Sequence, residues 1–427
     1  MTTPNRTQLL LQIAAAFLLV LGVQARTWTS ADGSKTFEGE LQSYDAASRK
    51  VSVTLRSGKR MTFSQDKLSE EDIAWLKKNG GRSGGSTVDI GELPKELPDP
   101  DGEEADMSKP VQVYILMGQS NMLGSGRIKG GNGSLEHAVK EKKLYPYLAD
   151  GEGNWTERKD VRNVRVKIPR GGGMMAFYNE FMTIGSDKIG PNIGPEHGIG
   201  HYVGHVTDAP VMILKSCIGN RALGWDLLPP GSESFEFTDA SGKTWVHPGY
   251  KGSPERWEKG TEPKRIGWYA GKQYDDDIGA VKKALADLDT YYPGAKEYEV
   301  AGFFWWQGDR DSRSAALSGR YEKNLVHLIK QLRKEFEAPN AKFVCASLGQ
   351  TKKGATDGGG KILDAMLAVD GTTGKYPEFK GNVAAVYAYL LSKGGSSGGH
   401  YGGNAETYMN VGEAMGKAMV ELLKADK

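Results

Sequence analysis

The sequence predicts an α/β protein, with a doubly wound parallel sheet preceded by a small all-β module. The main observation is a set of short, almost continuous apolar runs, which are typical of strands covered on both faces. The runs are Val111 to Met117, Pro210 to Leu214, Val300 to Trp306, Lys342 to Ser347 and Val383 to Tyr389. Helical patterns alternate with these runs. They cover Asp277 to Leu288, Tyr321 to Phe336, Lys361 to Val369 and Ala405 to Leu423.

Length and composition indicate a folded chain of about two domains. The chain has 427 residues, of which 38% are hydrophobic and 25% are charged, values that are ordinary for a globular protein. The net charge is only +2, and no basic run could neutralise a row of phosphates. The sequence therefore predicts no nucleic-acid partner.

The N-terminus has the pattern of a secretory leader. Arg6 precedes an apolar run from Leu9 to Val23, and Val23-Gln24-Ala25 is the kind of sequence that signal peptidase cuts. The run is shorter than the roughly 20 residues that cross a bilayer as a helix. We therefore predict a signal peptide at residues 1–25, a secreted or periplasmic location, and no membrane contact after the leader is cleaved.

Residues 26–79 are predicted to form a small β-barrel closed by a helix. Four β-rich runs are separated by turn residues such as Asp32-Gly33, and Ser69 stands where it can cap the helix. The runs are Arg26 to Thr29, Thr36 to Leu41, Lys50 to Leu55 and Arg60 to Phe63. Together with Trp28 and Asp72, these residues resemble the SLA1 homology domain 1. The resemblance implies an SH3-like barrel that serves as a spacer or docks to a cell surface or another protein.

The rest of the chain is predicted to be a linker and one large domain. Residues 80–110 are rich in Gly and Ser, then in Pro and acidic residues, which predicts a flexible linker. The domain spans residues 111–427. Cys217 and Cys345 lie in apolar, strand-like segments, so two buried thiols are favoured over a disulfide. Two such cysteines alone cannot build a metal site, and no metal or cofactor is predicted.

Candidate catalytic residues follow the predicted strands, because ligands of a doubly wound sheet bind beyond the carboxyl ends of its strands. Ser120 follows the first run after Gly118, where a tight turn would present its hydroxyl as a nucleophile. Gln307 ends a later run and supplies an amide donor for a developing oxyanion. Gly219 can offer its backbone N–H to the same oxygen. His400, in a loop before the last helix, can act as the base.

Four sequence blocks in order resemble the sialate O-acetylesterase and acetyl-xylan esterase group of SGNH hydrolases, carbohydrate esterase family 6. The blocks are Gly118-Gln119-Ser120-Asn121, Gly194-Pro195-Glu196 with the strand that carries Lys215, Trp306-Gln307-Gly308-Asp309 with Asp311, and His400-Tyr401 with Gly403-Asn404-Ala405-Glu406. The resemblance implies an SGNH-type fold and hydrolysis of O-acetyl esters on carbohydrate without a cofactor. It implies Ser120 as the nucleophile and His400 as the base. It also implies an oxyanion hole formed by the N–H groups of Ser120 and Gly219 and the side chain of Gln307.

The acid of the triad is left open between two aspartates. Many SGNH enzymes carry Asp three residues before the histidine, where this chain has Ser397, and Asp309 replaces the family's Glu. Asp311 keeps the family's residue type, whereas Asp309 is one methylene shorter than the Glu it replaces. We therefore favour Asp311 over Asp309 as the residue that orients His400.

Two further patterns bear on function. His197, His201 and His205 recur on one helix face, which could bind a metal, but an ordinary helix face is favoured because no Glu completes a His-Glu-x-x-His motif. The insertions at 127–193 and 225–272 are expected to set the choice of glycan, and exposed tryptophans in the second would stack on sugar rings. The alternative function is a non-catalytic carbohydrate-binding protein on the same fold.

Overall fold

The computed structural model describes residues 26–45, 49–55, 59–79, 88–169 and 172–425. The predicted leader at residues 1–25 lies outside this range. The chain divides into two compact units, Met1–Gly85 and Ser86–Lys427. In the part of the chain that the structure describes, no helix combines the length and the apolar character needed to cross a membrane.

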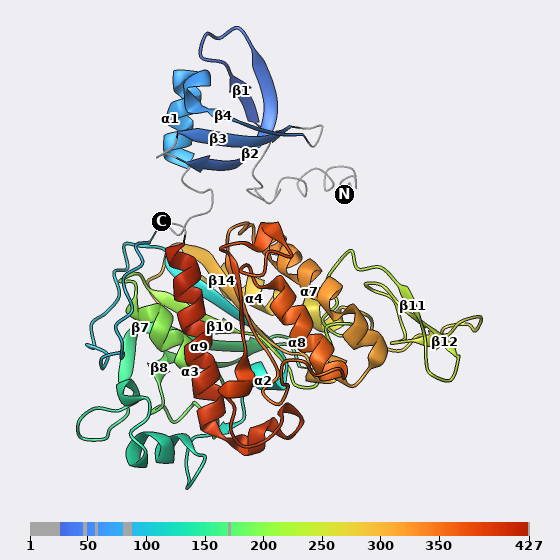
Figure 1. Ribbon diagram of the computed structural model, residues 1–427. Helices are drawn as coiled ribbons and strands as arrows, with labels where there is room; N and C mark the ends of the chain where they lie inside the picture. The colour runs from blue at the N-terminus through green and yellow to red at the C-terminus, as the bar shows by residue number, and fades with distance from the viewer. Residues whose placement is uncertain (1–25, 46–48, 56–58, 80–87, 170–171, 426–427) are drawn as a thin grey trace, which may run out of the picture. The chain divides into compact units, whose positions relative to one another are not determined.

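The first unit is a four-stranded antiparallel sheet followed by a helix (Figure 1). Its elements are β1 (Arg26–Thr29), β2 (Thr36–Asp45), β3 (Lys50–Leu55), β4 (Arg60–Ser64) and α1 (Glu70–Asn79). The four predicted strands are present, and Ser69 Oγ caps the helix by accepting a hydrogen bond from the Asp72 backbone N–H at 3.2 Å. Trp28 is fully buried in a small core of its own. The SH3-like barrel remains a prediction.

The second unit is built on a seven-stranded sheet in the order β16-β15-β14-β5-β10-β7-β8. All neighbouring strands are parallel except β7 and β8, which are antiparallel. The strands are β5 (Val111–Gly118), β7 (Glu157–Lys167), β8 (Met175–Thr183), β10 (Val211–Lys215), β14 (Tyr298–Trp306), β15 (Lys342–Ala346) and β16 (Val383–Val386). The predicted α/β architecture with a largely parallel sheet is therefore confirmed.

Helices cover both faces of this sheet (Figure 1). One face carries α3 (Glu196–His205) and α9 (Ala405–Lys424), and the other carries α4 (Lys272–Ala286), α7 (Ala315–Glu335) and α8 (Gly358–Val369). Side chains along β5 alternate between the two layers. Tyr114 and Leu116 pack in the cluster of α3 and α9, whereas Val113 and Ile115 pack in the cluster of α4, α7 and α8. Because both layers are apolar, β5 is an almost continuous apolar run.

Two strands of the sheet were not predicted. β7 and β8 lie in the segment that the sequence assigned to an insertion at 127–193. The β7 sequence contains many charged residues, which conceal its buried Val161 and Val164. Arg165 is also buried, because its guanidinium pairs with the Glu196 carboxylate at 3.1 Å. A strand whose buried positions include charged residues does not form an apolar run in the sequence. The search for apolar runs therefore did not predict β7.

Part of the segment predicted as a flexible linker at 80–110 packs against the large unit from residue 88 onward. Val88, Ile90 and Leu97 are buried, and Ile90 belongs to the hydrophobic cluster of α3 and α9. The Gly91 N–H donates to the carbonyl oxygen of Val206 at 2.6 Å. A few well-spaced apolar side chains therefore attach this polar, Pro-rich segment to the large unit.

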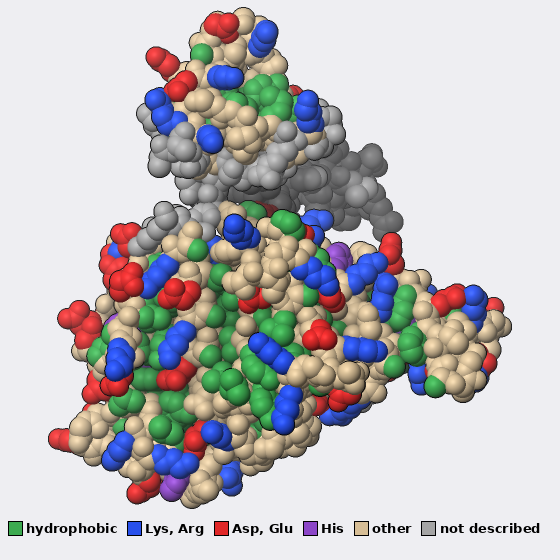
Figure 2. Space-filling view, viewed as in Figure 1, with side chains coloured by type: hydrophobic (Ala, Val, Ile, Leu, Met, Phe, Trp, Pro, Cys, Tyr) green, Lys and Arg blue, Asp and Glu red, His purple; other side chains and the backbone are tan. Residues whose placement is uncertain are grey.

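The insertion at 225–272 forms a small antiparallel sheet that projects from the main sheet in Figure 1. Its strands are β11 (Phe235–Thr238), β12 (Thr244–His247) and β13 (Trp257–Glu258). Trp225 is buried, whereas Trp257 and Trp268 are half-buried. Figure 2 shows acidic and basic side chains intermixed over the visible face of the large unit, in keeping with the nearly balanced charge of the sequence.

The two cysteines are unpaired and buried, as predicted. Cys345 lies within β15, and Cys217 lies just beyond β10. Burial raises the pKa of both thiols, that of Cys217 to about 12, so both are held in the protonated, unreactive form.

Candidate active site

The predicted site residues follow three neighbouring strands at the centre of the sheet. Ser120 follows β5, Gly219 follows β10, and Gln307 follows β14. These strands are adjacent and parallel, so their carboxyl ends lie at one edge. The chain also changes direction here, because β7 and β10 lie on one side of β5 and β14, β15 and β16 on the other. Such a switch point is where ligands bind in open α/β sheets.

Ser120 is the first residue of a one-turn helix, α2 (Ser120–Leu123). The turn that leads into it depends on Gly118, which has φ +151° and on which a Cβ would lie 2.4 Å from the Trp306 carbonyl oxygen. No residue other than glycine fits there. The serine is nine-tenths buried, with 9% of its surface exposed at the sheet edge.

Gly219 lies beside Ser120. A Cβ atom added at Gly219 would be 3.5 Å from the Ser120 Cβ. Among the hydrogen bonds of the described residues, neither the Gly219 N–H nor the Ser120 N–H has an acceptor. Both groups are therefore available to an oxygen bound next to Ser120. Their role in an oxyanion hole stays a prediction, which this placement favours.

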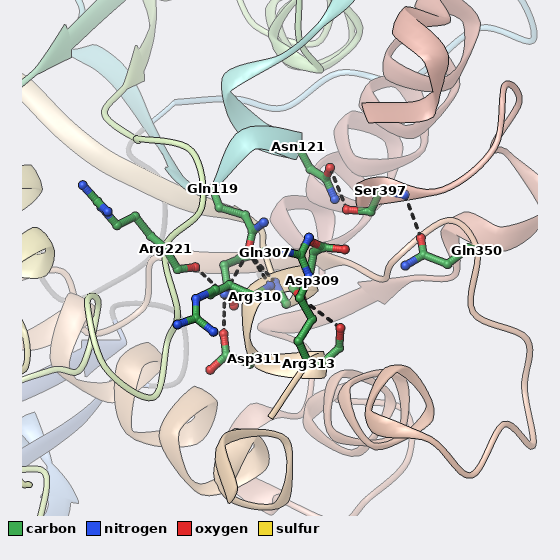
Figure 3. A network of polar contacts seen from close by, with 12 residues as sticks. Gln119, Asn121, Arg221, Gln307, Asp309, Arg310, Asp311, Arg313, Gln350 and Ser397 are labelled. Carbon is green, nitrogen blue, oxygen red and sulfur yellow. Dashed lines mark hydrogen bonds and ion pairs between the residues drawn. The ribbon is translucent and has the colours of Figure 1, made fainter. Parts of the chain in front are cut away.

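Gln307 does not fit the predicted role of oxyanion donor. Its side-chain Nε2 lies 2.5 Å from Asp311 Oδ2, 2.8 Å from the Arg221 carbonyl oxygen and 3.1 Å from Gln119 Oε1 (Figure 3). An amide nitrogen has only two hydrogens, and three protein acceptors surround this one. The side chain is also fully buried. Gln307 therefore joins the segments that follow the three strands, and its role in binding the oxyanion stays a prediction that these contacts do not favour.

Asp311 is likewise engaged inside the protein rather than with His400. Its carboxylate accepts hydrogen bonds from the N–H groups of Gly224 at 2.8 Å and Leu223 at 2.9 Å, in addition to Gln307. Burial raises the pKa of Asp311 to about 6, although these hydrogen bonds oppose the shift. The carboxylate holds the loop after β10 against β14. The choice of Asp311 as the triad acid stays a prediction, which these contacts do not favour.

Asp309 is the aspartate that faces the histidine loop. Its Oδ1 lies 3.8 Å from the position that a Cβ would take on Gly398, and its Oδ2 forms an ion pair with Arg313. In Figure 3, Asp309 lies on the side of Ser397, whereas Asp311 lies on the side of Arg221. Of the two candidates, Asp309 is therefore the one placed beside the histidine loop at Gly398, two residues before His400.

The histidine loop is tied to the nucleophile block through Asn121. Ser397 Oγ donates to Asn121 Oδ1 at 3.0 Å, and Asn121 Nδ2 donates to the Tyr401 hydroxyl at 3.4 Å. Asn121 was not singled out from the sequence, although it stands in the Gly-Gln-Ser-Asn block. Ser397 therefore donates a hydrogen bond from its neutral hydroxyl to the residue next to Ser120.

His400 lies in the turn η7 (Ser397–Gly403) and is exposed. His400 and Tyr401 both have left-handed backbone angles, with φ of 50° and 52°, which are uncommon for residues other than glycine and often mark functional sites. Within the described residues, no hydrogen bond joins the imidazole to Ser120 or to either aspartate. The structure thus brings the loop to the site without completing a triad.

Two of the three histidines of α3 form part of the packed interior, whereas His205 is half-buried. His197 and His201 are buried, and the His201 ring lies 4.6 Å from the Tyr147 ring. Burial lowers the pKa of His197 to about 3, so this ring is neutral. The part of the chain that the structure describes contains no group of three His, Cys, Asp or Glu residues able to hold a metal ion.

A buried carboxylate also lies beneath the loop that carries Gly219. Asp277 on α4 accepts hydrogen bonds from Ser216 Oγ at 2.8 Å and from Gln273 Nε2 at 3.0 Å through the same oxygen, Oδ1. Its other oxygen, Oδ2, has no partner among the described residues. Burial raises the pKa of Asp277 from 3.8 to about 7. The neutral acid is therefore the favoured form in the folded protein over most of the acidic range.

This pKa predicts a loss of stability as pH rises. Because the folded-state pKa of Asp277 lies above its unfolded value, its contribution is fully present below about pH 4 and is lost as pH rises through about 7. Asp277→Asn cannot ionise, so we expect its Tm to fall less than that of the wild type, by at least about 2 °C, between about pH 5 and pH 8. Thermal unfolding followed by circular dichroism measures this difference. Parallel Tm curves for the two proteins would contradict the buried-acid assignment.

One family model matches part of the large unit. Residues 251–421 match the model described as "Carbohydrate esterase, sialic acid-specific acetylesterase". The matched range contains Gln307, Asp309, Asp311 and His400, and it begins after Ser120. No curated protein sequence matches the chain.

Three solved structures are similar at low sequence identity. A protein from Arabidopsis thaliana has 16% identity and a TM-score of 0.41, over 73% of this chain and 98% of that one. XAC1771, a carbohydrate acetylesterase from Xanthomonas citri, has 12% identity and a TM-score of 0.43, over 72% of this chain and 55% of that one. NanS has 13% identity and a TM-score of 0.30, over 58% of this chain and 69% of that one.

Proposed function

We propose that the large unit is a serine esterase that removes O-acetyl groups from carbohydrate, of the sialate O-acetylesterase or acetyl-xylan esterase type. The observation that carries the proposal is the placement of Ser120 at the end of a central strand, next to the unbonded N–H of Gly219. The family match over residues 251–421 supports ester hydrolysis and a carbohydrate substrate.

In the proposed mechanism, His400 accepts the hydroxyl proton while Ser120 Oγ attacks the acetyl carbonyl carbon. The carbonyl oxygen becomes an oxyanion, which the N–H groups of Ser120 and Gly219 stabilise. Collapse of this intermediate breaks the ester bond, and His400 returns the proton to the departing sugar oxygen. Water then attacks the acetyl-serine by the same route and releases acetate.

This mechanism requires the His400 imidazole to reach Ser120 Oγ. Catalytic hydrogen bonds commonly tighten only when the substrate is bound, so an exposed histidine on an adjoining turn is compatible with the role of base. Asp309 is the carboxylate that we assign to orient it, because Asp309 Oδ1 lies next to the turn at Gly398. The ion pair with Arg313 holds the Asp309 carboxylate in place.

A non-catalytic carbohydrate-binding protein is the second candidate. It is favoured by Ser397 in the place of the usual Asp and by the absence, in the described residues, of a hydrogen bond between His400 and Ser120. Turnover of p-nitrophenyl acetate separates the two candidates. Binding of acetylated glycan without Ser120-dependent turnover would favour the second.

The proposed reaction is tested by acetate release from a panel of glycans. The panel contains O-acetylated xylan, an O-acetylated sialoglycan and the same glycans after alkaline removal of their O-acetyl groups, which leaves any N-acetyl groups in place. We expect acetate from at least one O-acetylated member and from none of the treated controls. Acetate release that Ser120→Ala leaves unchanged would contradict the proposal.

We further propose that the protein acts outside the cytoplasm and that residues 26–79 are a separate docking module. The first unit has its own core around Trp28, Val51 and Val53. Deleting residues 26–79 is therefore expected to leave kcat for a small soluble ester within about twofold of the wild type, because separate units interact weakly by default. Kinetic assays on p-nitrophenyl acetate measure this, and a tenfold loss of kcat would show that the module acts on the site.

A further inference from the structure

A buried lysine supports the helix that carries Ser120. Lys215 ends β10, and its side chain is 1% exposed. Its ammonium Nζ donates to Glu196 Oε2 at 2.7 Å, to the Leu123 carbonyl oxygen at 2.9 Å and to the Met122 carbonyl oxygen at 3.2 Å. These three acceptors match the three hydrogens of an ammonium group.

The two carbonyl groups belong to the last residues of α2. A helix leaves its final carbonyls without partners, and a helix of one turn does not hold its own shape, because helix nucleation is unfavourable. The position of α2 (Ser120–Leu123) therefore depends on what binds its ends. At its first residue is Ser120, and at its last two are the carbonyls that Lys215 binds.

Glu196 completes this arrangement from α3. Its other oxygen, Oε1, accepts a hydrogen bond from the Gly194 N–H at 3.2 Å and pairs with Arg165. Burial alone would raise the pKa of Glu196, but the positive charges of Lys215 and Arg165 outweigh it and hold the pKa at about 2. A Cβ on Gly194 would lie 2.5 Å from Glu196 Oε2, so only glycine fits at this point. These contacts give a physical reason for the Gly194-Pro195-Glu196 block.

A buried ion pair is a poor means of stabilising a fold, since apolar residues of similar size are often as good or better. Such pairs are better suited to fixing one geometry, because each hydrogen bond has a direction. Here two of the hydrogen bonds from Lys215 are directed at the last carbonyl groups of α2. We propose that the Lys215–Glu196 pair is a positioning device that holds Ser120 Oγ in its attacking place. The inference rests on the proposed role of Ser120 as the nucleophile, and the pair acts through Ser120 without touching substrate.

The test compares the rate at which a fluorophosphonate probe modifies Ser120, together with kcat and KM for p-nitrophenyl acetate. The main variant is Lys215→Met, which removes the ammonium group while Glu196 keeps its ion pair with Arg165, so that no buried charge is left without a partner. Lys215→Arg is the second variant, because a planar guanidinium cannot reproduce the three bonds of the ammonium. Arg158→Met/Asp160→Asn is the control, since it removes a largely buried ion pair of β7 that has no hydrogen bond to α2.

We expect the main variant to fold and to lose about a hundredfold in both the labelling rate and kcat, the effect of a displacement of about 1 Å. KM should stay nearly unchanged, and the control should behave as the wild type. Either Lys215 variant, if folded and labelled at the wild-type rate, overturns the inference. A wild-type protein that takes no label at Ser120 overturns the proposed function and this inference with it. Normal labelling of the wild type together with normal labelling of the variants overturns the positioning role alone.

Discussion

Ser120→Ala is expected to abolish esterase activity, with a fall in kcat on the order of 10⁴ or more. The substitution removes the only atom that forms the covalent bond in the proposed mechanism. In the described structure the Ser120 hydroxyl makes no hydrogen bond, so its loss leaves no buried polar group unpaired. We therefore expect the free energy of unfolding to change by no more than about 0.5 kcal/mol.

The matched control for this variant is Ser318→Ala. Ser318, the fourth residue of α7, is 3% exposed, comparable with Ser120, and has no part in the proposed mechanism. We expect this variant to keep wild-type kcat on p-nitrophenyl acetate. If Ser120→Ala retained most of its activity, the nucleophile would have to be another residue.

Asp309→Asn is expected to have the second largest effect. If Asp309 orients the imidazole, the amide would favour the wrong tautomer of His400, and kcat should fall by about 10²–10⁴ with KM nearly unchanged. The side chain of its ion-pair partner Arg313 is 54% exposed and can be solvated, so stability should change little. Steady-state kinetics and thermal unfolding measure the two effects separately.

Asp311→Asn is expected to lower the stability of the fold more than the catalytic rate, in contrast to Asp309→Asn. The Asp311 carboxylate accepts from two backbone N–H groups, and an Asn side chain would turn its own N–H₂ toward one of them. We expect a loss of about 1–3 kcal/mol in the free energy of unfolding, with a smaller effect on kcat. If Asp311→Asn were inactive at unchanged stability while Asp309→Asn stayed active, the assignment first favoured from the sequence would be restored.

The sheet was predictable where burial alone determines the residues. Strands such as β5 and β15 are covered by helices on both faces, so their sequences are apolar apart from Gln112 and Lys342 near their starts. β7 was not predicted because a charged residue, Arg165, occupies one of its buried positions. Arg165 is buried there as the ion-pair partner of Glu196, which lies on a different element and is not evident from the β7 sequence. The polar segment after Val88 was assigned to a linker for a similar reason, since its attachment rests on a few apolar side chains.

The sequence predicted those site residues whose positions follow from the ends of the strands. Ser120 and Gly219 lie beside each other because adjacent parallel strands end at one edge. The hydrogen bonds of Gln307 and Asp311 are formed with backbone groups of the loop after β10. The spacing of residues in the sequence does not show which backbone groups of that loop will face these side chains. The preference for Asp311 followed residue type, whereas the structure distinguishes the two aspartates by the segment that each one faces.

The residue that becomes acetylated during turnover is the most direct test of the central claim. The protein is mixed with p-nitrophenyl acetate, quenched in acid within the first turnover and digested, and the modified peptide is identified by mass spectrometry. We predict an acetyl group on Ser120, in step with a burst of p-nitrophenol, and neither signal in Ser120→Ala. Turnover that proceeds with no acetyl group on Ser120, or with one on a different residue, would contradict the account.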